Sequence, residues 1–187
     1  MLRWLAGITV LVLAAACGRP ESVPAPDKYR LPIPACDMLN DVTVGELTRP
    51  FQKTKDEART SSGDHVEATE CDRDFQDEHS RLFLAVQVLR YSTGDGATGV
   101  DRARKVQPAD YSDVPGFEGL SIAPHDPTTQ VALARDGNVV VRISLQAVFS
   151  GSAEAYPEAY REFETIEPEK CVLVFAKDAA AALGQHR

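Results

Sequence analysis

Residues 130–145, QVALARDGNVVVRISL, determine the centre of the fold. Two runs rich in branched side chains, Gln130–Arg135 and Val139–Leu145, flank the sequence Asp136-Gly137-Asn138. Asp-Gly pairs between such runs are a strong signal for a tight β-hairpin, because these residues accept the backbone angles that the turn needs. The stretch therefore predicts a β-hairpin. Alternate residues of its second strand are expected to share one face: Val139, Val141, Ile143 and Leu145.

A second predicted antiparallel pair lies earlier in the chain. His65–Phe75 alternates imperfectly, and Arg81–Tyr91 is rich in branched and aromatic residues, with Gln76–Ser80 between them. Gly116–Ala123 follows a turn signal and predicts one more short strand. Lys53–Asp64 is polar and is expected to be a surface loop. Within the second strand of the early pair, one face is expected to carry Leu82, Leu84, Val86 and Val88.

Helices are expected around these strands. A first helix is predicted near Val42–Thr48, ahead of Pro50, and a weaker one over Ala97–Val106. Tyr156–Phe163 and Pro168–Gly184 predict two C-terminal helices. In the last helix an apolar stripe is expected to lie on the sheet: Val172, Phe175, Ala176, Ala179 and Leu183. The order of elements predicts an α+β fold, with an antiparallel sheet of about five strands and helices packed mainly on one face.

The N-terminal stretch Met1–Cys17 has the pattern of a lipoprotein signal. Arg3 provides a basic start, Leu5–Val12 is apolar, and small residues directly precede Cys17. This arrangement resembles the bacterial lipobox, although Ala14 stands where Leu is usual. In a lipobox the cysteine sulfur receives a diacylglycerol and cleavage occurs just before that residue. An ordinary cleaved secretory signal is the main alternative. A retained membrane helix is a lesser one, because the apolar run is shorter than the ~20 residues that span a bilayer.

The expected organisation therefore has three parts. Residues 1–16 are a signal peptide, residues 17–34 are the lipidated cysteine and a Pro-rich tether, and residues 35–187 are a single globular α+β domain. The tether could hold the domain roughly 50 Å from the lipid surface. Its last part, Tyr29–Ile33, could instead pack along the domain as an irregular strand. The expected location is the extracytoplasmic face of the cell membrane, with lipid anchoring.

The negative net charge of the chain limits the classes of partner that it is expected to bind. The net charge is −8, and it becomes −9 once Arg3 is removed with the signal peptide. This balance disfavours nucleic acid and anionic lipid headgroups. Contact with the membrane is therefore expected through the acyl chains on Cys17 alone, which carry enough methylene groups for stable attachment.

Three cysteines remain if Cys17 is lipidated. One disulfide and one free thiol is the simplest partition among Cys36, Cys71 and Cys171 outside the reducing cytosol. We favour Cys36 with Cys71, whose loop would stabilise the fold by roughly 3 to 4 kcal/mol. Cys171 would then be a small apolar residue buried on a helix. An intermolecular disulfide through Cys171 is a lesser alternative.

Candidate chemical groups form no familiar catalytic or metal-binding pattern. Asp64–His79 holds seven carboxylates and two histidines, but at no calcium or zinc spacing, so a solvated acidic face is favoured over a metal site. Ser121 and His125 lie close in sequence without a nucleophile elbow, and His125 is expected in a surface turn. Gly94–Gly99 imitates a phosphate-binding loop but lacks its lysine. We therefore name no catalytic residue, metal ligand or cofactor.

Several segments together resemble a known family. They are the lipobox and tether, Pro34-Ala35-Cys36-Asp37-Met38-Leu39, Cys71 about 35 residues later, Gly116–Leu120, the Asp-Gly hairpin and the Ala-rich last helix. Over roughly Ala35–Gly184 the chain resembles the uncharacterised actinobacterial surface lipoproteins that form a domain-of-unknown-function family. The resemblance implies a cell-envelope location and a Cys36–Cys71 pairing, without an activity to carry over. The chain departs from the pattern in Asp72-Arg73-Asp74 and in the additional Cys171.

Three functional interpretations follow. The leading one is a non-enzymatic envelope lipoprotein that presents a disulfide-closed domain to a small ligand, a lipid or another envelope protein. The alternative is an envelope hydrolase with dispersed active-site residues, which a deep pocket holding His65 or His125 with a carboxylate and a hydroxyl would support. The third is a sensory or accessory subunit, which an exposed apolar patch of several hundred Å² would favour.

Overall fold

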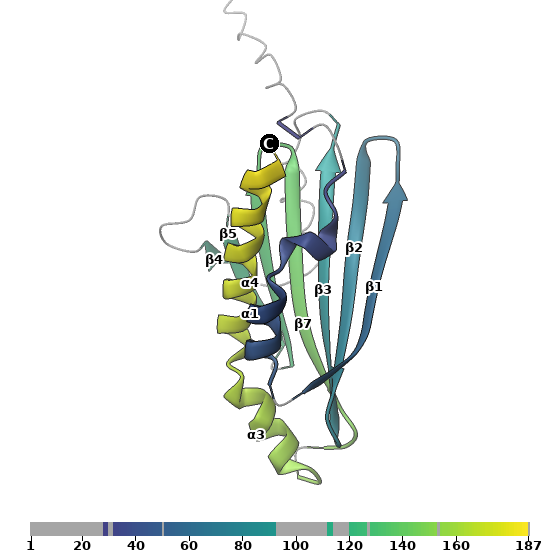
Figure 1. The fold of residues 1–187 in the computed structure, drawn as a ribbon. Coiled ribbons are helices and arrows are strands. Elements are labelled where there is room, and N and C mark those ends of the chain that lie inside the picture. Colours follow the sequence, from purple (N-terminus) through teal and green to yellow (C-terminus); the bar gives the residue numbers. More distant parts are fainter. Residues whose placement is uncertain are drawn as a thin grey trace, which may run out of the picture.

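A computed structural model describes residues 28–29, 32–49, 51–92, 112–113, 120–126, 128–152 and 154–186. Its strands form one antiparallel sheet in the order β1-β2-β3-β7-β6-β5-β4 (Figure 1). Antiparallel pairing and the presence of helices confirm the α+β prediction. Among the described residues the sheet has seven strands, so the expected number of about five was too low. The strands are β1 (Gln52–Ser62), β2 (Val66–Gln76), β3 (Ser80–Tyr91), β4 (Ser112–Asp113), β5 (Leu120–Asp126), β6 (Thr129–Asp136) and β7 (Val139–Phe149).

Both predicted strand pairs are confirmed. β2 and β3 pair from Val66↔Tyr91 to Gln76↔Arg81, and β6 pairs with β7 up to Asp136↔Val139. Gly137 has φ +58° at the first position of this turn, a backbone angle that glycine adopts without strain.

The predicted loop at Lys53–Asp64 is wrong, because most of it is the edge strand β1. All residues of β1 are exposed except Glu57, which is partly exposed. A strand with solvent on both faces shows no apolar alternation, so its sequence resembles that of a loop. Its charged side chains fit its position, because charges on an edge strand discourage pairing with other chains.

The described helical segments are η1 (Ala35–Met38), α1 (Asp41–Leu47), α3 (Pro157–Thr165), α4 (Pro168–Leu183) and η2 (Gly184–His186). Asn40 caps α1, because its side chain accepts hydrogen bonds from the backbone N–H groups of Val42 and Thr43. Pro168 occupies the first turn of α4, as expected. The helix predicted over residues 97–106 lies outside the described residues.

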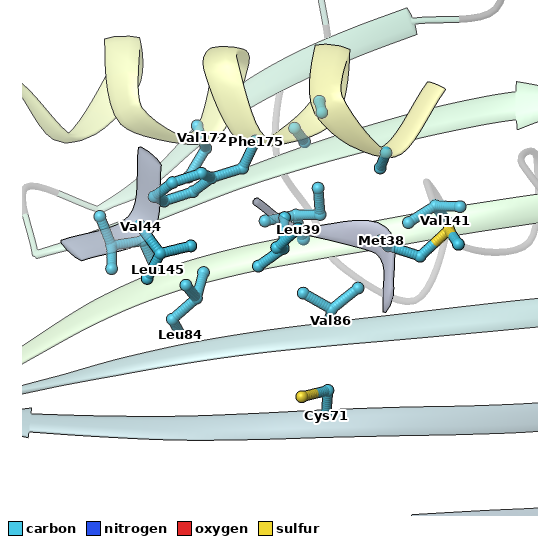
Figure 2. Packing of buried hydrophobic residues seen from close by; sticks show 14 of the residues in the cluster. Met38, Leu39, Val44, Cys71, Leu84, Val86, Val141, Leu145, Val172 and Phe175 are labelled. Carbon is cyan, nitrogen blue, oxygen red and sulfur yellow. The ribbon is translucent and has the colours of Figure 1, made fainter. Parts of the chain in front are cut away.

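The main core lies between α4, the η1–α1 segment and the sheet. α4 packs against β5, β6 and β7, and all five residues of its predicted apolar stripe are buried. Figure 2 shows Val172 and Phe175 of α4 near Leu145 of β7. The predicted inward faces of β3 and β7 are also confirmed, because every residue named for them is buried in this cluster.

A smaller second cluster involves alternate positions of the same strands. Tyr91, Leu133 and Val140 are buried in it, and Val66 and Leu89 pack against it. Val140 lies between Val139 and Val141, which belong to the main core, so β7 has buried residues on both faces here. This explains the continuous apolar run at the start of β7.

The disulfide joins Cys36 of η1 to Cys71 of β2. Their Cα atoms are 5.0 Å apart, within the range that a disulfide spans. Cys171 is free and buried on α4, as the sequence predicts. Within the described part of the chain, no helix combines the length and apolar character needed to cross a membrane.

Candidate functional site

Asp77 is the organising residue of the turn between β2 and β3. Its Oδ1 accepts hydrogen bonds from the backbone N–H of His79 at 2.8 Å and of Ser80 at 2.6 Å. The Ser80 hydroxyl also donates to Asp77, at 2.7 Å to Oδ1 and 2.8 Å to Oδ2. Ser80 is buried, so its hydroxyl is committed to closing this turn.

A second carboxyl group, Glu162 of α3, approaches Asp77. Partial burial raises the pKa of Asp77, but the hydroxyl of Ser80 and the backbone amides outweigh it and hold this pKa below its ordinary value of 3.8. The pKa of Glu162 is raised above 4.5 by burial and then by the negative charge of Asp77, with which it shares a side-chain hydrogen bond. Of the two carboxyl groups, Glu162 is therefore the one that holds a proton more readily.

Aromatic rings hold α3 beside this turn. The rings of His79 and Tyr156 have centroids 4.8 Å apart, and those of Phe149 and Tyr160 are stacked at 3.8 Å. The backbone N–H of Ser150 donates to the His79 carbonyl at 2.9 Å. Together these contacts give the turn and α3 a fixed relative position.

An open cavity of about 520 Å³ lies next to Asp77. Two carboxylates, two amides and one hydroxyl line it: Gln52, Thr54, Gln76, Asp77 and Glu78. Its volume is within the range of small-molecule sites, but its lining is polar where such sites are usually apolar. This chemistry suits a polar ligand with hydrogen-bond donors or positive charge.

A second open cavity, of about 300 Å³, lies at the opposite end of β2 and contains His65. Here Arg90 forms an ion pair with Glu67, and the Ser92 hydroxyl lies 3.4 Å from the backbone oxygen of His65. A histidine, carboxylates and hydroxyls therefore do meet around His65, although His65 is exposed. The full lining is Ser62, Gly63, Asp64, His65, Val66, Glu67, Arg90 and Ser92.

Three of the seven carboxylates in the acidic stretch Asp64–His79 form ion pairs with arginines of neighbouring strands, and a fourth accepts a hydrogen bond from a neutral amide. Its carboxylates on β2 have these partners: Glu67 with Arg90, Glu70 with Gln87, Asp72 with Arg59, and Asp74 with Arg81. Among the described residues, the ligand atoms close enough to hold a metal ion belong to Cys36, Asp56 and Cys71. The two sulfurs of that group form the disulfide, so they are not thiolate ligands.

Arg73 is a buried charge that the sequence reasoning missed. Its side chain is 5% exposed, and Nη1 lies 2.7 Å from Asp41 of α1. Nε lies 3.5 Å from Asp56 of β1 and makes no hydrogen bond. The available signal was its spacing, because Arg73 alternates with Cys71 and Phe75 on the inward face of β2.

The remaining candidate residues do not gather into one site. His125 belongs to β5 and not to a surface turn, because pairing with β6 continues through a register irregularity between Pro124 and Asp126. Ser121 is buried on the same strand. Cys17 and the segment 94–99 lie outside the described residues.

Exposed apolar surface is sparse in the described residues. The large apolar side chains that are exposed there are Val42 of α1 and Val148 of β7. These two residues lie on different elements. They give no support for the continuous apolar patch that the interpretation as a sensory or accessory subunit would need.

Comparison of the chain with known protein families, curated proteins and solved structures found no match. The resemblance to actinobacterial surface lipoproteins therefore stays a prediction from the sequence motifs.

Proposed function

We propose that this protein is a non-enzymatic lipoprotein of the cell envelope that binds a small polar ligand or an envelope protein. The acidic, amide-lined cavity beside Asp77 supports this proposal most directly. Its carboxylates are matched to a ligand with positive charge. The Ser80 hydroxyl, which donates a hydrogen bond to Asp77, is buried and is not among the residues that line this cavity.

The proposal also includes the processing and the membrane anchoring of the chain. Residues 35–187 form a single domain, residues 1–16 are removed, and the lipidated Cys17 holds the domain on the extracytoplasmic face of the membrane. The helices cover mainly one face of the sheet. The Cys36–Cys71 disulfide supports an oxidising compartment, because disulfides persist there and are rare in the cytosol.

Binding at the cavity is tested with spermidine, a small polycation, by titration calorimetry. We expect the wild-type protein to bind it and Glu78→Gln to weaken binding severalfold, because Glu78 lines the cavity. Glu164→Gln is the matched control, since Glu164 is an exposed acid on α3 outside that lining. Equal weakening by the two variants, or no heat with the wild-type protein, would refute a specific cationic-ligand site.

The anchor is tested separately in cells by radiolabelled palmitate and detergent-phase partitioning. We expect the wild-type protein to take the label and enter the detergent phase, and Cys17→Ala to do neither. A Cys17→Ala protein that stayed equally bound to membranes would refute lipid anchoring.

The alternative function, an envelope hydrolase, is favoured by one observation, the meeting of His65 with carboxylates and hydroxyls in the smaller cavity. Saturable hydrolysis of p-nitrophenyl acetate by the wild-type protein, well above the rate of free imidazole and lost in His65→Gln, would support it. Equal rates for the two proteins would remove this support.

A further inference from the structure

Tyr29, near the start of the described chain, is bound to the turn between β6 and β7. Its side chain is 1% exposed. Its backbone N–H donates to Asn138 Oδ1 at 3.0 Å, and Asn138 Nδ2 donates to the Tyr29 carbonyl at 3.0 Å. The same Nδ2 donates to the Tyr91 carbonyl of β3 at 2.8 Å. Asn138 therefore pairs both backbone groups of Tyr29, as a neighbouring strand would.

The side chains strengthen this attachment. The Tyr29 hydroxyl donates to Asp136 Oδ2 at 2.7 Å and lies 3.2 Å from the carbonyl oxygen of Leu183, at the end of α4. Lys28 forms an ion pair with Asp136. A Cβ atom at Gly137 would lie 2.9 Å from Lys28 Cβ, so glycine permits this close approach. We call the contacts of Lys28 and Tyr29 with this turn the Tyr29 clamp.

The clamp lies at one particular end of the sheet. The turn after Asp136 lies beside Tyr91, whose N–H donates to the Asn138 carbonyl, and Tyr91 pairs with Val66 at the start of β2. We call this the Asn138 end. The turn at Asp77 and helix α3 lie at the other end of the strands, the Asp77 end (Figure 1).

The number of residues between Cys17 and the clamp limits how far the proposed anchor can lie from the clamp. Ten residues lie between Cys17 and Lys28, and these eleven residue steps would span about 34 Å in polyproline II geometry. β3 has 12 residues and is therefore about 40 Å long. Inverting the domain so that its Asp77 end touched the bilayer would require a tether at least as long as the sheet.

We infer that the Tyr29 clamp orients the domain, with its Asn138 end toward the bilayer and its Asp77 end facing outward. This inference rests on the proposed lipidation of Cys17. The cavity beside Asp77 and helix α3 then face partners that approach from outside the membrane, while the His65 cavity lies on the side of the bilayer.

Energy transfer to a lipid acceptor tests the orientation. Chains that begin at Cys17 are coupled through that thiol to a maleimide lipid in phosphatidylcholine vesicles containing a rhodamine lipid. A donor dye is attached through an azide-bearing amino acid at position 64, at the Asn138 end, or at position 158, on α3. We expect transfer to fall severalfold from position 64 to position 158. Equal or reversed transfer would overturn the orientation.

Two further measurements show whether the clamp causes the orientation and whether Cys17 is lipidated. In Asn138→Ala, checked for folding by circular dichroism, the difference between the two positions should shrink, because the clamp is loosened; an unchanged difference would show that the clamp does not orient the domain. Palmitate labelling of Cys17 in cells tests the anchor independently of the vesicles. Labelling without an orientation difference would refute only the orientation, and absence of label would refute both proposals.

Discussion

At the scale of single residues, Asn138 joins Tyr29 to β3. Its amide makes three hydrogen bonds to backbone groups of Tyr29 and Tyr91, and its side chain is 1% exposed. We expect Asn138→Ala to lower the free energy of unfolding by about 2–4 kcal/mol, because buried backbone groups lose their partners. Urea unfolding measures this. Asn138→Asp is the matched variant: it keeps the acceptor but loses the two donated bonds, so a wild-type stability for it would contradict the assigned roles.

Glu162 makes stability depend on pH. Its folded pKa is raised, so the protonated form is the stabilising one, and this contribution is lost as pH rises through the folded pKa. Its charge faces Asp77 and Glu158, with His79 acting in the opposite direction. We expect Glu162→Gln to raise stability at neutral pH by no more than about 0.5 kcal/mol, because the residue is largely exposed.

Urea unfolding of Glu162→Gln and wild type between pH 4 and pH 8 measures this difference. The gain should disappear in acid, where wild-type Glu162 is already protonated. Asp77 has the opposite effect on stability in both proteins. Its pKa is lowered in the folded state, so its contribution to the free energy of unfolding is lost as pH falls through the folded pKa. Glu164→Gln serves as the control for loss of one charge from α3, and a pH-independent difference would contradict the pairing of Glu162 with Asp77.

Cys171 is expected to be chemically inert in the folded protein. Burial, and secondarily the charge of Glu167, raise the pKa of its thiol to about 11. Its Sγ donates to the Ile166 carbonyl at 2.9 Å. We therefore expect no measurable reaction with iodoacetamide at pH 8 until urea unfolds the chain, in protein carrying Cys17→Ala. Labelling followed by mass spectrometry tests this, with Cys171→Ala as the blank, and rapid labelling of the native protein would show that the thiol is accessible.

At the scale of elements, Arg73 links α1 and β1 to β2. Its partner Asp41 is 75% exposed, so this carboxylate can regain water when the arginine is replaced. We therefore expect Arg73→Met to change the free energy of unfolding by less than about 1 kcal/mol, because methionine keeps the apolar stem. Arg73→Ala should cost about 2–3 kcal/mol through lost packing. Equal losses in the two variants, measured by urea unfolding, would show that the charge matters more than the stem.

Local sequence patterns were sufficient to predict the helices and strands whose apolar side chains lie on one face or are buried on both. The turn at Gly137, the alternation in β3 and the apolar stripe of α4 each depend on residues close in sequence, and each is confirmed. β1 was missed because its only described sheet neighbour is β2 and solvent reaches both of its faces.

The candidate site could not be predicted in the same way. Asp77 and Glu162 are far apart in sequence and meet only because α3 packs beside the β2–β3 turn. The partners of Arg73 likewise come from two other elements. Among these contacts between distant residues, only the disulfide could be predicted from the sequence, because the small number of cysteines limits the possible pairings.

At the scale of the whole molecule, the disulfide restricts the unfolded chain over a separation of 35 residues. We expect the Cys36→Ser/Cys71→Ser double variant to lose about 3–4 kcal/mol of stability. Urea unfolding measures the loss, and reduction of the wild-type protein should reproduce most of it. Cys171→Ser is the control for a cysteine outside the bond. A double variant as stable as wild type would mean that the bond does not contribute to folding.

The same covalent bond also decides what happens when a protease cuts the protein once. All of β1, including exposed Lys53, Lys55 and Arg59, lies between Cys36 and Cys71 in the sequence. Trypsin cleavage at any of these side chains would divide the polypeptide into two pieces that stay joined through sulfur. A nicked molecule would therefore not be shed from its N-terminal segment until a reductant opened the bond.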